Sequence, residues 1–151
     1  MARKSTNQRP LRPHPISEAQ QRANWRRLDR DRTTQETGAA QEAIDLGEVV
    51  RVSAANELNL ARANTDANAR PVGIAVETMA NGHTGAYKTS GLIRNAAWAL
   101  TPGAIYFLSG VTAGAIVASP DVTSEGQYVI ILGRAQSATE FILDIKQRVR
   151  L

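Results

Sequence analysis

The chain has no cysteine among its 151 residues, so disulfide bonds and thiolate metal sites are excluded. Its two histidines, His14 and His83, lie far apart in the sequence, which argues against a histidine-rich metal centre. No apolar run approaches the roughly twenty residues that a membrane-spanning helix needs. The basic N-terminus is not followed by an apolar segment, so it does not resemble a secretory signal. The sequence therefore predicts a protein that holds no metal or other cofactor and binds no membrane.

Positive charge is concentrated at the N-terminus. Residues 1–36 contain nine Lys or Arg and four Asp or Glu, a net charge of +5. Residues 37–151 contain nine basic and ten acidic residues, a net charge of −1, although the whole chain carries +4. The basic character therefore belongs to an N-terminal arm and not to the body that follows it.

The arm, which we place at residues 1–41, divides into three predicted parts. Residues 1–15 contain three prolines and almost no apolar side chain, so we expect them to be extended. Ser17-Glu-Ala-Gln20 resembles a helix capping box, and the sequence after it predicts a short helix over about residues 17–32. Residues 33–41 are predicted to be a linker, which leaves residues 42–151 as the β domain.

The arm carries the side chains that we expect to bind a partner. They are Arg3, Arg9, Arg12, Trp25, Arg26, Arg27, Leu28 and Arg30. Arginine binds phosphate well, which raises nucleic-acid binding as one interpretation. Asp29 and Asp31 interrupt the basic cluster, however, and the alternation of charge also suits a solvated helix face. We prefer an arm that lies along a neighbouring protein, with a solvated tail and nucleic-acid binding as the alternatives.

The body is predicted to be all-β. Short apolar runs alternate with turn signals such as Asn81-Gly82 and Thr101-Pro102-Gly103. We expect eight or nine strands, over residues 48–53, 58–63, 72–78, 85–89, 92–94, 105–109, 115–118, 127–135 and 140–146. Short strands at close spacing predict a small barrel or sandwich-like module, and a β-tulip-like arrangement is one form that it could take.

The body also contains an internal similarity. Gly47–Ser53 and Gly103–Ser109 share a layout in which a glycine precedes an apolar alternation and a serine ends it. Each is followed by a second short apolar run and then by a third run that crosses a glycine, at residues 71–76 and 128–133. The pattern predicts a two-fold repeat of a three-strand unit, with chance similarity between short β-rich segments as the alternative.

No arrangement of residues in the sequence points to catalysis. There is no Gly-x-Ser-x-Gly, no phosphate-binding loop and no His-Glu pattern at metal spacing. We interpret His83 as an exposed turn residue, and Asp121 with Glu125 as solvated loop carboxylates. Trp98, Tyr106 and Phe107 are interpreted as core or self-association residues. The sequence therefore does not predict an enzyme.

Several motifs of the body resemble small β proteins of tailed-phage particles. They are Pro71-Val-Gly-Ile-Ala-Val-Glu-Thr78, Ser90-Gly-Leu-Ile93, Trp98-Ala-Leu-Thr-Pro-Gly-Ala-Ile-Tyr-Phe-Leu-Ser109, Ala113-Gly-Ala-Ile116, Gly126-Gln-Tyr-Val129, Leu132-Gly-Arg-Ala135, Ser137-Ala-Thr139 and Leu143-Asp-Ile145. In this pattern the chain is similar to phage capsid decoration (cement) proteins and to the related β domains of head and tail fibres. The resemblance covers about residues 45–146 and leaves the arm out.

The resemblance implies a virion structural protein, made in the host cytoplasm and located on the capsid surface. Such a protein would bind the major capsid protein, clamp neighbouring shell subunits from outside, and associate with itself, with a trimer as the favoured state. Three alternatives stay open. They are a head-fibre or tail appendage, an internal virion protein associated with nucleic acid, and an ordinary cellular β domain.

Overall fold

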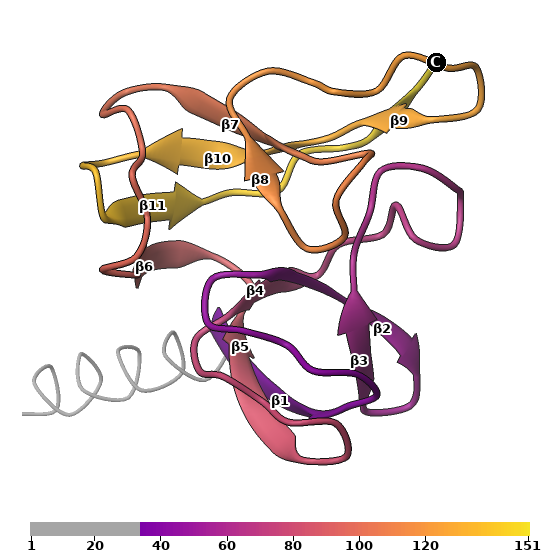
Figure 1. The fold of residues 1–151 in the computed structure, drawn as a ribbon, viewed down its shortest axis with the longest axis vertical. Coiled ribbons are helices and arrows are strands. Elements are labelled where there is room, and N and C mark those ends of the chain that lie inside the picture. The colour runs from indigo at the N-terminus through magenta and orange to yellow at the C-terminus, as the bar shows by residue number, and fades with distance from the viewer. Residues whose placement is uncertain (1–33) are drawn as a thin grey trace, which may run out of the picture. The chain divides into compact units, whose positions relative to one another are not determined.

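Residues 34–151 are described by a computed structural model of the chain, and they form an all-β fold (Figure 1). Five strands close a barrel, five form an open sheet, and two form a short ribbon. The predicted all-β class is therefore confirmed for this part of the chain. The predicted extended segment, the predicted helix and the eight predicted partner-binding residues of the arm lie outside the described residues.

The barrel contains β1 (Gln35–Ala40), β2 (Val49–Ala54), β3 (Glu57–Leu60), β4 (Gly73–Ala75) and β5 (Thr84–Lys88). The strand order is β1-β3-β2-β4-β5, and pairing of β1 with β5 closes the ring. Only the contact of β1 with β3 is parallel, and the other pairs are antiparallel.

The first strand corrects the predicted boundary of the β domain, because residues 35–40 were expected to belong to a linker. This segment reads Gln-Glu-Thr-Gly-Ala-Ala and lacks the apolar alternation that marks a strand. Pairing with both β3 and β5 makes it a strand instead. Gly38 is required by this close packing, since a Cβ there would lie 2.7 Å from the Cγ of Leu58.

The open sheet is antiparallel throughout and has the order β6-β11-β10-β7-β8. Its strands are β6 (Gly91–Arg94), β7 (Ile105–Leu108), β8 (Ile116–Val117), β10 (Ile131–Ala135) and β11 (Glu140–Leu143). The ribbon pairs β9 (Tyr128–Val129) with β12 (Val149–Arg150). The single strand predicted over 127–135 is therefore two strands, because β9 pairs with β12 while β10 pairs with β7 and β11.

Barrel and sheet share one strand order, and we call them the barrel repeat and the sheet repeat. The barrel can be read as β1-β5-β4-β2-β3 and the sheet as β6-β11-β10-β7-β8, with antiparallel contacts at every step. The two differ at the ends: β1 pairs with β3, whereas β6 and β8 are sheet edges. Each repeat thus contains five strands, and not only the three that the sequence pattern suggests.

Glycines at matching positions support this correspondence. Gly47 and Gly103 both have positive φ, 93° and 84°, at the entry to β2 and β7. The Gly47 N–H donates to the Ala75 carbonyl at 2.9 Å. The Gly103 N–H donates to the Ala135 carbonyl at 2.8 Å. The same turn therefore leads into the same strand pairing in both repeats.

A second pair of glycines, Gly73 in β4 and Gly133 in β10, fixes how these two strands correspond. A Cβ at Gly73 would collide with the carbonyl oxygen of Lys88, and one at Gly133 would collide with that of Ile142. Both carbonyls belong to the neighbouring strand of their own repeat. Residues 72–75 (Val-Gly-Ile-Ala) thus correspond to residues 132–135 (Leu-Gly-Arg-Ala).

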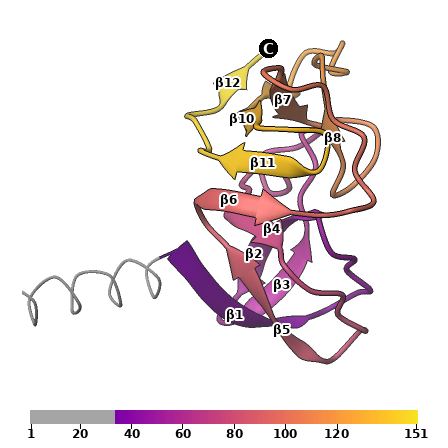
Figure 2. The same cartoon turned by 90° about the vertical axis from the view of Figure 1, so that its left-hand side faces the viewer.

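The main core lies where the outer face of the barrel meets the inner face of the sheet, which runs above it in Figure 2. Val49 and Ile74 of the barrel are fully buried there against Leu132 and Phe141 of the sheet. A smaller cluster fills the barrel interior and contains Ala40, Ile44, Val50, Leu58, Ala75, Met79 and Tyr87. The barrel repeat is therefore packed on both faces, against the sheet outside and around its own small core inside.

Candidate interaction surface

The outer face of the sheet repeat is apolar and uncovered by any described residue of the chain. Along β7, Tyr106 and Leu108 point into the core, whereas Ile105 and Phe107 lie on the opposite face. Ile105 is 51% exposed, and Phe107 is half-buried. In β11, Ile142 lies on this same outer face between buried neighbours. A sheet face of this composition is typical of a surface that binds another protein.

A shallow hollow of about 330 Å³ lies on this face. It is lined by Ile105, Ile131, Gly133, Arg134, Ile142, Asp144 and Lys146. The isoleucines supply apolar surface, and Gly133 contributes no side chain that would fill the space. Charged groups stand at the rim, where Lys146 Nζ lies 2.7 Å from a carboxylate oxygen of Asp144. We call Ile105, Ile131, Gly133, Arg134 and Ile142 the isoleucine face.

Arg134 is the charged member of this face. Its side chain is exposed, and within residues 34–151 it forms no salt bridge with a carboxylate. Arg94, also on the sheet, differs, because its Nε lies 2.7 Å from a carboxylate oxygen of Glu140. An apolar hollow with an uncompensated guanidinium beside it suits a protein partner with an acidic group.

The barrel repeat shows what covers the corresponding positions there. By register, Val49 and Ile74 correspond to Ile105 and Arg134. Both barrel residues have no exposed surface, because the sheet repeat lies on them. The outer face of the barrel and the isoleucine face are therefore equivalent, but the described residues cover only the first.

The three aromatic residues predicted as core or self-association residues differ in where their side chains lie. Tyr106 is 6% exposed, and its hydroxyl accepts a hydrogen bond from the Thr101 N–H at 2.9 Å. Trp98 is half-buried and packs edge-on against Phe141, with ring centroids 6.0 Å apart. Tyr106 and Trp98 therefore belong to the core, and only Phe107 lies on the outer face.

The isoleucines of the hollow were missed by the sequence interpretation, which placed them in strands without a role. Alternation in a strand shows that residues 105 and 107 share a face, but it does not show which face is covered. The packing of the folded chain, which buries Tyr106 and leaves Ile105 exposed, identifies this face as the uncovered one.

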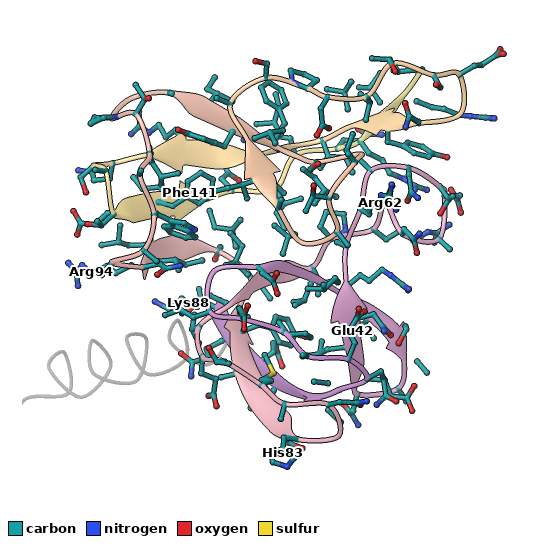
Figure 3. The ribbon with its side chains drawn as sticks, viewed as in Figure 1. Glu42, Arg62, His83, Lys88, Arg94 and Phe141 are labelled. Carbon is teal, nitrogen blue, oxygen red and sulfur yellow. The ribbon has the colours of Figure 1, made fainter. Side chains whose placement is uncertain are left out.

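An acidic cluster lies on the barrel repeat. Burial raises the pKa of Glu48, and the nearby charges of Asp45 and Glu42 add to this rise. Glu42, labelled in Figure 3, accepts hydrogen bonds from the Asn59 side chain at 2.9 Å and the Leu60 N–H at 3.0 Å. Asp45 is exposed, and within the described residues its carboxylate forms no salt bridge. This cluster gives the barrel repeat a concentration of negative charge.

A network around Asp66 ties the C-terminal segment to the loop between β3 and β4. Hydrogen bonds from Arg70 and Arg148, together with a weaker one from the Tyr128 hydroxyl, lower the pKa of Asp66 to about 2. The Arg148 guanidinium also lies over the Tyr128 ring, 4.5 Å from its centroid. Both guanidinium groups donate to the Asp66 carboxylate and to nearby backbone carbonyls, so we interpret this network as structural.

The described residues contain no cluster that suggests catalysis. His83 lies at the tip of the barrel, far from the sheet, as Figure 3 shows, and it is exposed as predicted. Asp121 was expected to be a solvated carboxylate, but it accepts hydrogen bonds from the Ser109 hydroxyl and the Gly110 N–H. Although burial opposes it, this bonding lowers the pKa of Asp121, which organises the loop after β7. Within residues 34–151, no three His, Asp or Glu side chains are grouped to hold a metal ion.

No family model matches the chain, and a search of curated proteins finds no match. In the described part of the chain there is no helix of the length and apolarity needed to cross a membrane.

Proposed function

We propose that the chain is a virion structural protein that binds the outside of a phage capsid and stabilises the shell by clamping neighbouring major capsid protein subunits. The resemblance of residues 45–146 to decoration proteins motivates this proposal. The observation that supports it best is the uncovered isoleucine face, because an exposed apolar sheet face suits a structural protein that assembles with other protein chains, whether copies of itself or shell subunits. The proposal assigns the chain no catalytic activity and no cofactor.

The arm is the proposed clamp. Its prolines would give it reach, and Trp25 with Arg26, Arg27 and Arg30 would anchor it on acidic shell residues. Tryptophan and arginine are the residue types that most often dominate interface energy. A segment that becomes ordered only on docking can cover a long stretch of a neighbouring subunit, which suits a clamp. The proposal also includes a partly helical arm and a β-tulip-like form of the body.

Deletion of residues 1–33 tests the clamp. The boundary keeps β1 intact, since a deletion to residue 36 would remove two residues of that strand. We expect the truncated protein to lose binding to purified shells from which the full-length protein is absent. Its circular dichroism spectrum and melting temperature should stay close to those of the full chain. Retained shell binding by the truncated protein would refute the arm as the clamp.

The second candidate is a head-fibre or tail appendage, in which the arm anchors the chain and the β body projects outward. The exposed loops at the tip of the barrel, including that of His83, suit a projecting domain as well as a shell-bound one. Copy number in the particle distinguishes the two, because an appendage occupies few positions and a decoration protein many. An internal protein that binds DNA would instead lose affinity steeply between low and moderate salt.

A further inference from the structure

We propose that the isoleucine face is a self-association surface whose occupant is the barrel repeat of a second copy of this chain. The inference adds to the proposed function a specific interface, and it concerns the protein alone, without a shell. It depends on the geometry of the hollow, on the equivalence of the repeats and on charge.

The geometry favours a protein partner over a small ligand. The hollow is shallow and open to solvent, and its isoleucines come from three adjacent strands, β7, β10 and β11. Phe107 and Val117, paired across β7 and β8, extend the half-buried apolar surface beyond the hollow. Such a continuous apolar surface with a charged rim has the anatomy of an interface core and its border.

The repeat relation indicates what kind of surface fits. At the equivalent positions of the barrel repeat, Val49 and Ile74 are covered by a β-rich surface, the inner face of the sheet. Within one chain, the outer face of the barrel repeat is therefore already packed against a second β module, the sheet repeat. A β module from another copy would repeat that mode of packing.

Charge selects the barrel of the second copy. Residues 34–88 contain four basic and seven acidic residues, a net charge of −3, whereas residues 89–151 contain five basic and four acidic residues, a net charge of +1. Among the described residues, Arg134 forms no salt bridge with a carboxylate, and Asp45 forms none with a basic side chain. Docking Arg134 of one copy near Asp45 of the next would satisfy both.

The N-terminal segment is a poorer occupant of this face. Residues 1–33 contain nine basic and three acidic residues, so they carry the same sign of charge as Arg134 and Lys146. Like charges across an interface oppose docking. The segment suits an acidic surface instead, which leaves the isoleucine face to the barrel.

Contacts between different surfaces of identical chains close into rings when the rotation between copies allows it. A head-to-tail contact of sheet repeat to barrel repeat is of this kind. It would produce a cyclic oligomer if the rotation closes and an open chain of copies if it does not.

Sedimentation velocity on the full chain, over a range of concentrations, tests the surface. We expect the wild-type protein to associate, and Ile105→Glu to weaken association about thirtyfold or more, as for a residue at the centre of an interface. Val111→Glu is the matched control, because Val111 is even more exposed, at 61%, but lies in the loop after β7. Circular dichroism and melting temperature show whether each variant is folded. A monomeric wild-type protein, or equal association of folded Ile105→Glu and wild type, would overturn the proposal.

A charge swap tests the partner surface. We expect Arg134→Glu and Asp45→Arg each to weaken association about tenfold, and the double variant to regain most of it. Single variants that weaken association without rescue in the double variant would overturn the head-to-tail arrangement, as would unchanged association of Asp45→Arg. A shell-binding assay of the same variants keeps the two proposals apart: a chain that is monomeric yet binds shells refutes only the self-association surface.

Discussion

The barrel repeat and the sheet repeat are built on one strand order but are used differently. The barrel repeat closes on itself, fills its interior with a small core and is covered on its outer face by the sheet. The sheet repeat stays open and covers the barrel with its inner face, and no residue of the described part, 34–151, covers its outer face. The difference teaches that one arrangement of strands can serve as a packed base in one place and as a presented surface in another.

Residue size accounts for part of this difference. In β1, the end with Gly38, Ala39 and Ala40 is slim enough to pack between β3 and β5. The equivalent strand, β6, carries bulkier Leu92 and Ile93 and pairs with β11 alone. The small residues of β1 therefore let the barrel close around larger interior side chains such as Leu58, whereas β6 lacks such small residues at Leu92 and Ile93.

The largest expected effect comes from the aromatic residue that holds the two repeats together. Phe141 has no exposed surface, and Trp98 and Tyr106 pack edge-on against it. We expect Phe141→Ala to lower the free energy of unfolding by about 3–5 kcal/mol, since it removes a ring from the main core. Phe107→Ala, on the half-buried outer face, is the matched control. Chemical denaturation measures both, and equal losses would contradict the assignment of the two faces.

A smaller effect is expected from the network that joins the barrel repeat to the C-terminal segment. Asp66 has a folded-state pKa of about 2, below its ordinary 3.8, because Arg70 and Arg148 bond to its ionised form. Its contribution to stability is therefore present above about pH 4 and is lost as the pH falls towards 2. We expect Asp66→Asn to be less stable than wild type at neutral pH. The difference in free energy of unfolding between the two proteins should shrink as the pH falls from about 4 towards 2.

Denaturation of both proteins at a series of pH values checks this. Asp144→Asn is a control of the same chemistry, since among residues 34–151 the Asp144 carboxylate forms a salt bridge with exposed Lys146 alone. A gap between Asp66→Asn and wild type that stays constant from neutral pH to pH 2 would show that the Asp66 network does not act through its charge.

Much of the fold could be predicted because local signals marked it. The turns at Gly47 and Gly103 and the apolar alternation after each gave β2 and β7 within a residue or so. β1 could not be found in the same way, because Gly-Ala-Ala has no alternation and becomes a strand only by pairing with two partners.

The candidate site was less accessible to sequence reasoning. Trp98 and Tyr106 are conspicuous residue types, yet both are committed to the core. Ile105 is inconspicuous, and its exposure depends on which face of its strand another element covers. Contacts such as Asp66 with Arg148 join residues 82 positions apart, and no local pattern announces them.

The copy number of this chain relative to the major capsid protein, measured by quantitative mass spectrometry of purified particles, tests the proposed function most directly. A decoration protein predicts a ratio near one or a simple symmetric fraction of it, because it would occupy equivalent positions over the whole shell. A trace ratio would contradict decoration and favour a fibre or tail appendage. Absence of the chain from particles would contradict a virion role altogether.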